Sequence, residues 1–365
     1  MRWLIRIGAM LGIIIIAGII LLLLFREASQ WFTMSESKRI MENGGVSELV
    51  KLHVNGTEQY LLIEGNSKDR PVLLFLHGGP GVPFPFGVGM RGTYPEITDH
   101  FVAVYYDQRG SGKSYANNIP MESMNIAQFA EDTDVVVDYL RDRFNREKII
   151  VCGMSWGTIV GTQYSYYHPE KVEAYIGLSQ FVGHTENQQR AIDWLVDIAE
   201  RDDNKSLMEN VRSLGEPLLV GEQEEQLMGY ISQYGGDNYS DEQTKKASIF
   251  GMMWPALLSP DYSLKDIYQS VVSGAVFSLR KATNLQEEIN AVNLVEQYSE
   301  FEVPVYFFQG KHDKITNYEL AKEYFDRISA SAGKMFITLE QSAHYPNEHD
   351  FNIMVETLTE VFGES

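Results

Sequence analysis

Short, continuously apolar runs alternate with helical patterns over much of this chain, and few folds accommodate that alternation. The runs are Pro71–Leu76, Phe101–Tyr106, Lys148–Cys152 and Val172–Leu178. Strands that are buried on both faces of a sheet have this composition. Between the second and third runs, apolar residues of Ile126–Phe144 recur at helical intervals. Because strands that alternate with helices form a parallel sheet covered on both faces, the sequence predicts an α/β fold.

Further strand patterns lie at both ends of this region. Ser47–Val54 and Glu58–Glu64 are separated by Asn55-Gly56, which is a strong signal for a hairpin turn. Near the C-terminus, Val303–Phe308 and Lys334–Glu340 resume the strand pattern. We therefore expect the sheet to combine an N-terminal hairpin with parallel strands from both halves of the chain.

A long helical segment interrupts the sheet pattern. Residues 183–299 contain no convincing buried strand, but they include helical stretches such as Arg190–Ile198 and Asp266–Leu279. A helical insert in an α/β sheet is typical of a cap over the carboxyl edge of the sheet, where ligands of such folds bind. We expect a core of residues 46–182 and 300–365 with a cap of residues 183–299.

The N-terminus carries the longest apolar run. The 19 residues from Ile7 to Phe25 include no charge, and as a helix they would span about 28 Å, close to the roughly 30 Å of bilayer hydrocarbon. The run is longer than the apolar part of a signal peptide, and no clear cleavage site follows it. The sequence predicts an uncleaved transmembrane anchor over residues 1–25, followed by a tether over 26–45. A cleaved signal peptide is the alternative.

The charge of the chain restricts its partners and its location. Fifty acidic and 30 basic side chains give a net charge of -20, which repels phosphate backbones and excludes non-specific nucleic-acid binding. Without Arg2 and Arg6 the remainder carries about -22, which disfavours docking on anionic lipid. We favour a single-pass membrane protein whose body lies outside the cytoplasm, although similar charges flank the span and leave both topologies open. Its partner is the bilayer.

A serine between glycines follows one of the predicted strands. The motif GMSWG (153–157) comes directly after Lys148–Cys152 and before a potential helix, Thr158–Tyr167. A serine on a tight strand-to-helix turn needs small neighbours, because the backbones come close there. The turn exposes the serine Oγ beside a helix N-terminus, which favours developing negative charge. We expect Ser155 to be a nucleophile, with a simple turn as the alternative interpretation.

A histidine and an acidic residue follow two later strands. Asp313 lies in the loop after Val303–Phe308, and His344 follows the strand that ends near Glu340. Both loops belong to the sheet edge that carries Ser155, and the chain order serine, acid, histidine suits such a fold. We expect His344 to shuttle the proton and Asp313 to orient its imidazole. The alternatives are a helix-capping aspartate and an ordinary loop histidine.

Two glycine-containing loops complete the predicted site. HGGPG (77–81) follows a buried strand, and its glycines allow close approach of backbone N–H groups to an oxyanion. We expect the N–H groups of Gly79 and Trp156 to form the oxyanion hole, with an ordinary turn as the alternative interpretation of this loop. His77 and Gly78 belong to the same loop.

The second loop includes RGSGKS (109–114), which ends like a phosphate-binding loop. That loop requires a glycine at the position of Asp107, so the nucleotide-binding interpretation fails. We expect Asp107 and Arg109 to hold this loop near the site through hydrogen bonds. The single cysteine, Cys152, cannot form an internal disulfide, and no Cys/His cluster has zinc-like spacing.

With these segments assembled, the chain resembles the α/β-hydrolase superfamily and, more closely, the proline iminopeptidase family of serine peptidases. The resemblance rests on HGGPG (77–81), DQRGSGKS (107–114), GMSWG (153–157), GKHD (310–313) and AHYP (343–346). It implies a triad of Ser155, Asp313 and His344, an oxyanion hole formed by Gly79 and Trp156, and neither a metal nor an organic cofactor.

The chain departs from the family pattern at two points. Met154 replaces the second glycine of the family motif Gly-Gly-Ser-Trp-Gly. The family also implies cap glutamates that bind the free α-amine of the substrate, near an aromatic pocket for proline. The candidates, none of which matches a family motif, are Glu186, Glu216, Glu222, Glu224 and Glu225.

These observations predict a membrane-anchored serine hydrolase that acts through an acyl-enzyme on a small molecule or short peptide. The narrower expectation is an aminopeptidase that releases N-terminal proline or a small apolar residue. A carboxylesterase or lipase-like enzyme acting on amphiphilic esters is the alternative, and a cap carboxylate aimed at the pocket would favour the aminopeptidase. A non-catalytic binding protein of the same fold is a further alternative. Epoxide hydrolases and dehalogenases need a carboxylate nucleophile, which Ser155 does not provide.

Overall fold

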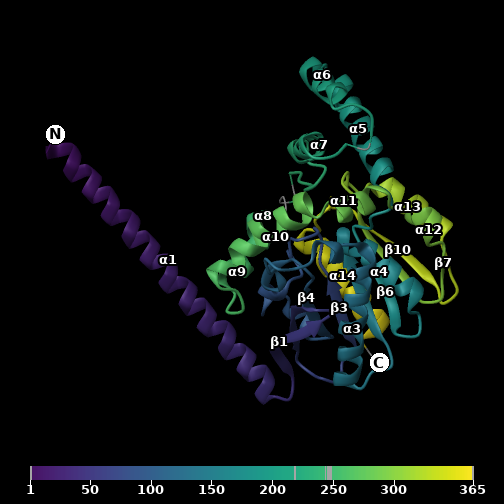
Figure 1. The fold of residues 1–365 in the computed structure, drawn as a ribbon, viewed down its shortest axis with the longest axis horizontal. Coiled ribbons are helices and arrows are strands. Elements are labelled where there is room, and N and C mark those ends of the chain that lie inside the picture. Colours follow the sequence, from purple (N-terminus) through teal and green to yellow (C-terminus); the bar gives the residue numbers. More distant parts are fainter. Residues whose placement is uncertain (1, 218, 243, 245–248, 364–365) are drawn as a thin grey trace.

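The computed structural model describes residues 2–217, 219–242, 244 and 249–363 (Figure 1). Among these residues, eight strands form one sheet in the order β1-β2-β4-β3-β5-β6-β8-β10. The strands are β1 (Val46–Val54), β2 (Thr57–Gly65), β3 (Val72–Leu76), β4 (Val102–Asp107), β5 (Ile149–Met154), β6 (Val172–Leu178), β8 (Val305–Gly310) and β10 (Lys334–Leu339). The pairs β1·β2 and β2·β4 are antiparallel, and the pairs from β4 to β10 are parallel. The predicted α/β class is confirmed.

The N-terminal hairpin has the register that its turn requires. Val54 of β1 pairs with Thr57 of β2, so the turn consists of Asn55 and Gly56. Both turn residues have positive φ angles, 43° and 81°. A two-residue turn of this kind matches the twist of the flanking strands, and the Asn-Gly pair adopts it at low cost.

Helices cover both faces of the sheet, and each face has its own apolar cluster. On one face, α3 (Ile126–Phe144), α4 (Trp156–Tyr167) and α13 (Tyr318–Arg327) contribute to a cluster with Leu74 and Leu76. On the other, α14 (Glu348–Phe362) and α2 (Pro95–Thr98) join a cluster with Leu73 and Phe75. Successive residues of β3 therefore point to opposite, equally buried faces, which explains why this strand is apolar throughout.

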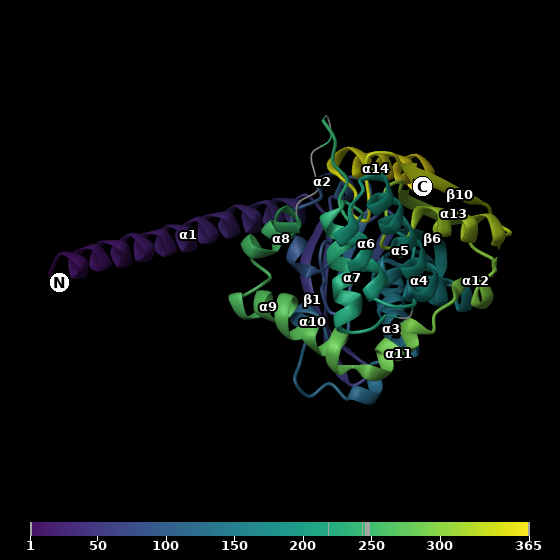
Figure 2. The ribbon, with the colours of Figure 1, turned by 90° about the horizontal axis from the view of Figure 1, so that it is seen from above.

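The described part of residues 183–299 is mainly helical, as predicted, and lies over the carboxyl edge of the sheet (Figures 1 and 2). Its helices are α5 (His184–Arg201), α6 (Lys205–Ser213), α7 (Glu222–Gln233), α8 (Ile249–Leu258), α9 (Leu264–Tyr268), α10 (Gly274–Val276), α11 (Thr283–Asn290) and α12 (Leu294–Gln297). Helices α5 to α7 share a separate apolar cluster that includes Leu195 and Ile231. We refer to residues 183–299 as the cap.

Several short elements were not expected from the sequence. Two strands of two residues, β7 (Glu300–Phe301) and β9 (Ser329–Ala330), pair in parallel outside the main sheet. Three single-turn 3-10 helices, Val88–Met90, Gly112–Ser114 and Met121–Ser123, lie in the loops after β3 and β4. Elements this short have no apolar periodicity that a sequence pattern could reveal.

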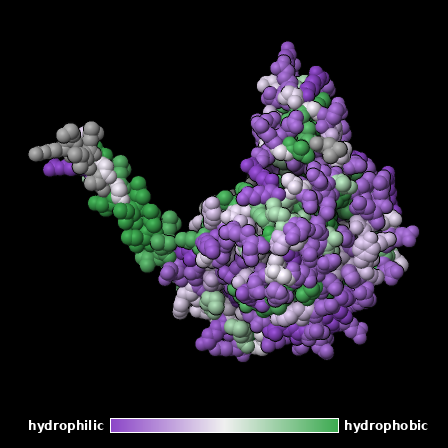
Figure 3. Space-filling view, viewed as in Figure 1, coloured by the Kyte–Doolittle hydropathy of each residue, from purple (hydrophilic) through white to green (hydrophobic). Residues whose placement is uncertain are grey.

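The N-terminal region is one continuous helix, α1 (Arg2–Glu42). By length and composition it can cross a membrane, and none of its most apolar window is buried in the structure. Figure 3 shows its apolar part projecting from a largely hydrophilic body. Residues 26–45 differ from the expected tether, because the helix continues to Glu42 and ends at Asn43-Gly44-Gly45. No glycine or proline interrupts residues 26–42, so the helix has no reason to end sooner.

Candidate active site

Ser155 lies on the sharp turn between β5 and α4. Its φ and ψ angles are 51° and -119°, a conformation that non-glycine residues rarely adopt. The two flanking positions must be glycine, because neither has space for a side chain. A Cβ on Gly157 would lie 2.0 Å from the carbonyl oxygen of Leu76, and one on Gly153 would lie 2.4 Å from the oxygen of Gly157. The motif therefore folds as predicted, with the serine at the carboxyl edge of the sheet.

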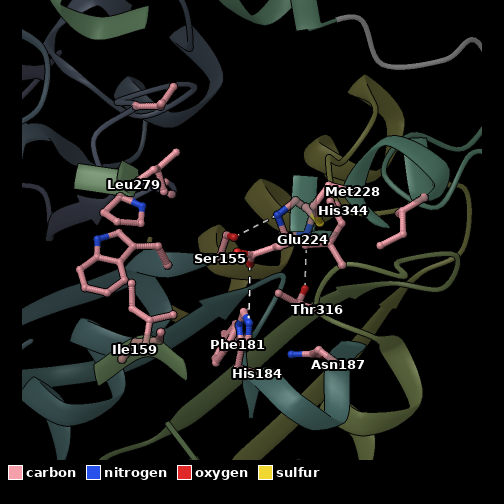
Figure 4. A pocket seen from close by; sticks show the side chains of 18 of the residues that line it. Ser155, Ile159, Phe181, His184, Asn187, Glu224, Met228, Leu279, Thr316 and His344 are labelled. Carbon is pink, nitrogen blue, oxygen red and sulfur yellow. Dashed lines mark hydrogen bonds and ion pairs between the residues drawn. The ribbon is translucent and has the colours of Figure 1, made fainter. Parts of the chain in front are cut away.

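The structure brings Ser155, His344 and Asp313 together, and Figure 4 shows the link between Ser155 and His344. The His344 Nε2 atom is 3.0 Å from the Ser155 Oγ atom. On the other side of the ring, His344 Nδ1 is 3.0 Å from Asp313 Oδ2. Asp313 and His344 lie in the loops that follow β8 and β10, so three parallel strands deliver the three side chains to one edge. This is the arrangement that a nucleophile, its base and an orienting acid require.

Asp313 is fully buried but surrounded by donors. Its Oδ1 accepts hydrogen bonds from the backbone N–H groups of Ile315 (2.8 Å) and Thr316 (2.9 Å). Its Oδ2 accepts from the Thr316 hydroxyl (2.6 Å) and from Gln309 Nε2 (3.0 Å). Burial alone would raise the pKa of Asp313, but the charge and hydrogen bond of His344 and the bonds from Thr316 outweigh it and lower the pKa. The carboxylate therefore stays ionised beside the imidazole.

Two backbone N–H groups beside Ser155 are free to bind an oxyanion. Trp156 is the first residue of α4, where an N–H has no partner within the helix. In the part of the chain that the structure describes, neither this N–H nor that of Gly79 donates a hydrogen bond. The HGGPG loop passes close to the serine, since a Cβ on Gly78 would lie 3.4 Å from the Ser155 Cβ.

His77 and Gln108 connect the two loops that carry these N–H groups. Because the Gln108 backbone N–H donates to His77 Nε2 (3.2 Å), the ring proton is on Nδ1, which donates to the Gly78 carbonyl (2.6 Å). Burial lowers the pKa of His77 to about 4, so the ring is neutral. The Gln108 side chain donates to the His77 carbonyl (3.0 Å) and accepts from Trp156 Nε1 (3.2 Å). Gln108 was not singled out from the sequence, because its role depends on both loops.

Asp107 and Arg109 support the loop of residues 107–114, and neither side chain lines the cavity described below. Asp107 accepts hydrogen bonds from the Lys113 backbone N–H (2.7 Å) and from the Tyr262 hydroxyl of the cap (2.7 Å). Burial raises the pKa of Asp107 to about 7, against the effect of these bonds. The buried Arg109 guanidinium makes a bidentate pair with Asp132 of α3, at 2.7 and 2.8 Å. The loop is therefore tied to the cap at one end and to the core at the other.

A cavity of about 330 Å³ lies between Ser155 and the cap. Most of its lining is apolar, with contributions from Val82, Phe84, Ile159, Phe181, Leu227, Met228, Ile231, Leu279 and Ile289. The polar side chains that the cap adds to the lining include His184, Asn187 and Glu224, which Figure 4 shows around the cavity. The cavity therefore suits a largely apolar group that also carries a few polar atoms.

Of the five cap glutamates considered from the sequence, Glu224 lines the cavity. Burial and the neighbouring charge of Glu225 raise the pKa of Glu224. Its Oε1 is 3.6 Å from His184 Nε2. Glu225, one residue further along α7, points elsewhere and pairs with Arg280 at 2.6 Å. A helix places successive residues about 100° apart, so only one of these neighbours can face the cavity.

Asn187 is a polar feature of the cavity that the sequence did not reveal. Its side chain is 5% exposed. Neither its Nδ2 nor its Oδ1 has a hydrogen-bond partner among the described residues. A buried amide in this state is costly unless a ligand or water satisfies it. Asn187 belongs to the cavity-facing side of α5, and no sequence motif marks it.

Comparisons with known proteins agree with this fold. A family model described as "alpha/beta hydrolase fold" matches residues 71–350. The Bacillus subtilis (strain 168) protein named "Probable aminopeptidase YbaC" is 28% identical over 321 residues, which cover 88% of this chain and 98% of that protein. A proline iminopeptidase of Clostridioides difficile (strain 630) is 23% identical and covers 82% of this chain and 92% of its own.

Solved structures share the fold at lower identity. Proline iminopeptidase of Mycobacterium smegmatis matches with a TM-score of 0.56 at 12% identity, and covers 87% of this chain and 98% of its own. An epoxide hydrolase of Vigna radiata matches with a TM-score of 0.54 at 20% identity, over 89% of this chain and 99% of its own. At these identities the likeness concerns the fold alone. On the family match, which spans most of the chain, this protein belongs to the α/β-hydrolase fold family.

Proposed function

We propose that this protein is a serine hydrolase that forms an acyl-enzyme on Ser155 and acts as an aminopeptidase on short peptides. The observation that carries the hydrolase part is the hydrogen-bonded series Ser155–His344–Asp313, with both links at 3.0 Å. Relatives named as an aminopeptidase and as proline iminopeptidases support the aminopeptidase part. The apolar helix α1 supports anchoring in a membrane. That the body lies outside the cytoplasm is part of the proposal and comes from the charge distribution of the chain.

The geometry supports a two-step reaction. In the first step, Ser155 Oγ attacks the scissile carbonyl carbon while His344 Nε2 takes its proton, and Asp313 stabilises the imidazolium. The N–H groups of Gly79 and Trp156 stabilise the oxyanion. The C–N bond then breaks, and the leaving amine takes the proton from His344. In the second step, His344 activates a water that hydrolyses the ester on Ser155 and returns the serine.

Glu224 is the feature that favours an aminopeptidase over an esterase. An aminopeptidase must bind a protonated α-amine, and a partly desolvated carboxylate is the side chain suited to that task. Glu224 lines the same cavity as Ser155. Asn187 can in addition donate to and accept from a peptide amide of the substrate. The apolar remainder of the cavity suits N-terminal proline or a small apolar residue.

The test measures hydrolysis of prolyl-, alanyl- and leucyl-arylamides, their N-acetylated forms and a short-chain aryl ester by the full chain in detergent. We expect arylamide turnover that needs a free α-amine and is lost in Ser155→Ala. Glu224→Gln should raise KM for the free-amine substrates by more than tenfold, since a charge pair worth about 1.5–3 kcal/mol is lost. The matched control is Glu225→Gln, because Glu225 pairs with Arg280 outside the cavity.

Other outcomes would assign the protein differently. Ester turnover alone, insensitive to Glu224→Gln, would favour a carboxylesterase, which the largely apolar lining also accommodates. Failure of a fluorophosphonate to label Ser155 would favour a non-catalytic binding protein of this fold. Labelling without turnover of either substrate class would keep the serine hydrolase and reject the aminopeptidase.

A further inference from the structure

The outer face of one cap helix is apolar although it is exposed. From Leu264 to Lys281 the chain is helical without a break, through α9, a π-helical stretch, α10 and a second π-helical stretch. Its exposed apolar residues are Leu264 (59% exposed), Tyr268 (60%), Val271 (39%), Val272 (39%) and Leu279 (44%). Separations of three and four residues place the first four on one side of the helix. We call these five residues the apolar stripe.

The other side of this helix is buried against the active-site loops. Ser270, Gly274, Phe277 and Ser278 are buried. Gly274 packs so closely on the HGGPG loop that a Cβ on Gly81 would lie 2.4 Å from its carbonyl oxygen. The helix is therefore held in place, and the stripe cannot be buried by a small rotation. A soluble protein normally places polar side chains on such an outer face.

The helix begins where the apolar part of α1 ends. The ring of Phe25, the last residue of the uncharged run, lies 6.5 Å from the ring of Trp254 in α8. The Arg26 guanidinium donates hydrogen bonds to the carbonyl oxygens of Leu257 and Tyr262. Leu264, the first residue of the stripe, follows two positions after Tyr262. The beginning of the stripe therefore lies beside the level at which the span would leave a bilayer.

The helix also has the direction of a surface helix. In Figures 1 and 2, α9, α10 and α11 lead away from α1 across the body instead of following it. Lys265, Arg280 and Lys281, near the two ends of the stripe, are exposed. An apolar face with basic residues at its margins is typical of helices that lie in the interface of a membrane.

We propose that the apolar stripe lies in the headgroup interface of the bilayer that α1 crosses. This inference rests on the proposed membrane anchor, and it adds a second membrane contact, made by the cap. Because Leu279 belongs both to the stripe and to the lining of the catalytic cavity, the contact places an edge of the cavity at the membrane surface. Substrates dissolved in the interface would then reach Ser155 without crossing bulk water.

The experiment places a spin label on the stripe. The native Cys152 is buried, and burial raises the pKa of its thiol, so it does not compete for the label. Tyr268→Cys and Val272→Cys are made in the full chain, labelled with a nitroxide and reconstituted into phosphatidylcholine vesicles. Met335→Cys is the control, because Met335 is 46% exposed. It lies on β10, the outermost strand at the other end of the sheet from β1.

The readout is the depth parameter from collisions with oxygen, which dissolves in lipid, and with a nickel chelate, which stays in water. At positions 268 and 272 we expect collisions with oxygen to prevail over collisions with the nickel chelate, as for a label in lipid. At position 335 we expect the depth parameter of a water-exposed label. The labelled protein must also float together with the vesicles in a density gradient. This measurement needs no catalytic turnover, so its failure is distinguishable from failure of the proposed peptidase activity.

Three results would overturn the proposal. Water-like values at both stripe positions in protein that floats would show that the stripe faces water. Spin–spin broadening that disappears on dilution with unlabelled protein would show that a second copy covers it. Protein that does not float would remove the anchor on which the proposal rests. Because two exposed positions are labelled, misfolding of one variant leaves the test intact.

Discussion

At the residue scale, the candidate active site contains two buried titratable groups that are each held in one protonation state. His77 is neutral because burial lowers its pKa, and its Nε2 accepts a hydrogen bond from the Gln108 backbone N–H. Asp313 is ionised because the donors around it outweigh burial. Burial favours the neutral form of both groups; it prevails at His77, whereas at Asp313 the charge and hydrogen bonds of the neighbours outweigh it.

His77 should make the protein sensitive to acid. Its pKa is lowered to about 4 in the folded state, whereas an unfolded histidine titrates near pH 6.5. Between these values the unfolded state binds more protons, so stability falls as the pH decreases from about 6.5 to 4, by about 3 kcal/mol. Denaturant unfolding at pH 7 and pH 4.5 measures this loss. His77→Gln should show a smaller difference between the two pH values, and an unchanged difference would contradict the assignment.

Replacing Asp313 should lower the rate of catalysis and leave substrate binding almost unchanged. In Asp313→Asn the amide donates to His344 Nδ1 and favours the wrong imidazole tautomer, so kcat should fall by roughly 10³–10⁴ with a small change in KM. Steady-state kinetics on the best arylamide tests this. The rate of fluorophosphonate labelling should fall in parallel, because both reactions need the same activated serine. Equal losses in kcat and binding would point to a structural role.

At the element scale, the contact between α4 and β3 leaves no room for a side chain. Gly157→Ala places a Cβ 2.0 Å from a backbone oxygen, which cannot move without distorting the central strand. We expect destabilisation of about 3 kcal/mol or more, at or beyond the upper end of overpacking effects. Gly229→Ala in α7 is the matched control, since a Cβ there meets nothing within 4 Å. It should stabilise by about 0.5–1 kcal/mol.

The melting temperatures of these two glycine variants, measured side by side, provide the test. If Gly157→Ala melts with the wild type, the turn at Ser155 is less tightly packed than the structure shows. The comparison separates the general effect of adding a methyl group from the effect of the tight turn.

At the scale of the whole molecule, the protein combines a strongly negative body with an uncharged run, Ile7–Phe25, in its N-terminal helix. If α1 spans the bilayer, hydrophobic burial holds the protein and salt should not release it. We expect the full chain to stay in the membrane fraction in 1 M salt and after alkaline carbonate extraction, conditions that remove surface-bound proteins. Intact mass measurement should give the full 41.5 kDa. Release by carbonate, or a mass lacking the first residues, would favour a cleaved signal peptide.

Much of the fold followed from local patterns in the sequence. The doubly buried strands, the Asn-Gly hairpin and α3 were predicted because side-chain periodicity and turn chemistry act over a few residues. Ser155, Asp313 and His344 could be placed together because each follows a strand of one parallel sheet, whose carboxyl ends share an edge. The continuation of α1 through residues 26–42 was not predicted, because the mixed polar composition of this segment indicated a tether, although no glycine or proline in it interrupts a helix.

The sequence by itself determined the class of fold, the motifs around Ser155 and the candidates for its base and acid. Only the tertiary structure decided which of five glutamates faces the cavity, that the Asn187 side chain lies there without a hydrogen-bond partner among the described residues, and that Gln108 links the two loops beside Ser155. The same holds for Arg26, which meets its partners 231 and 236 positions away in the chain. Local patterns determine what a segment becomes, whereas the direction in which its side chains face depends on packing between distant segments.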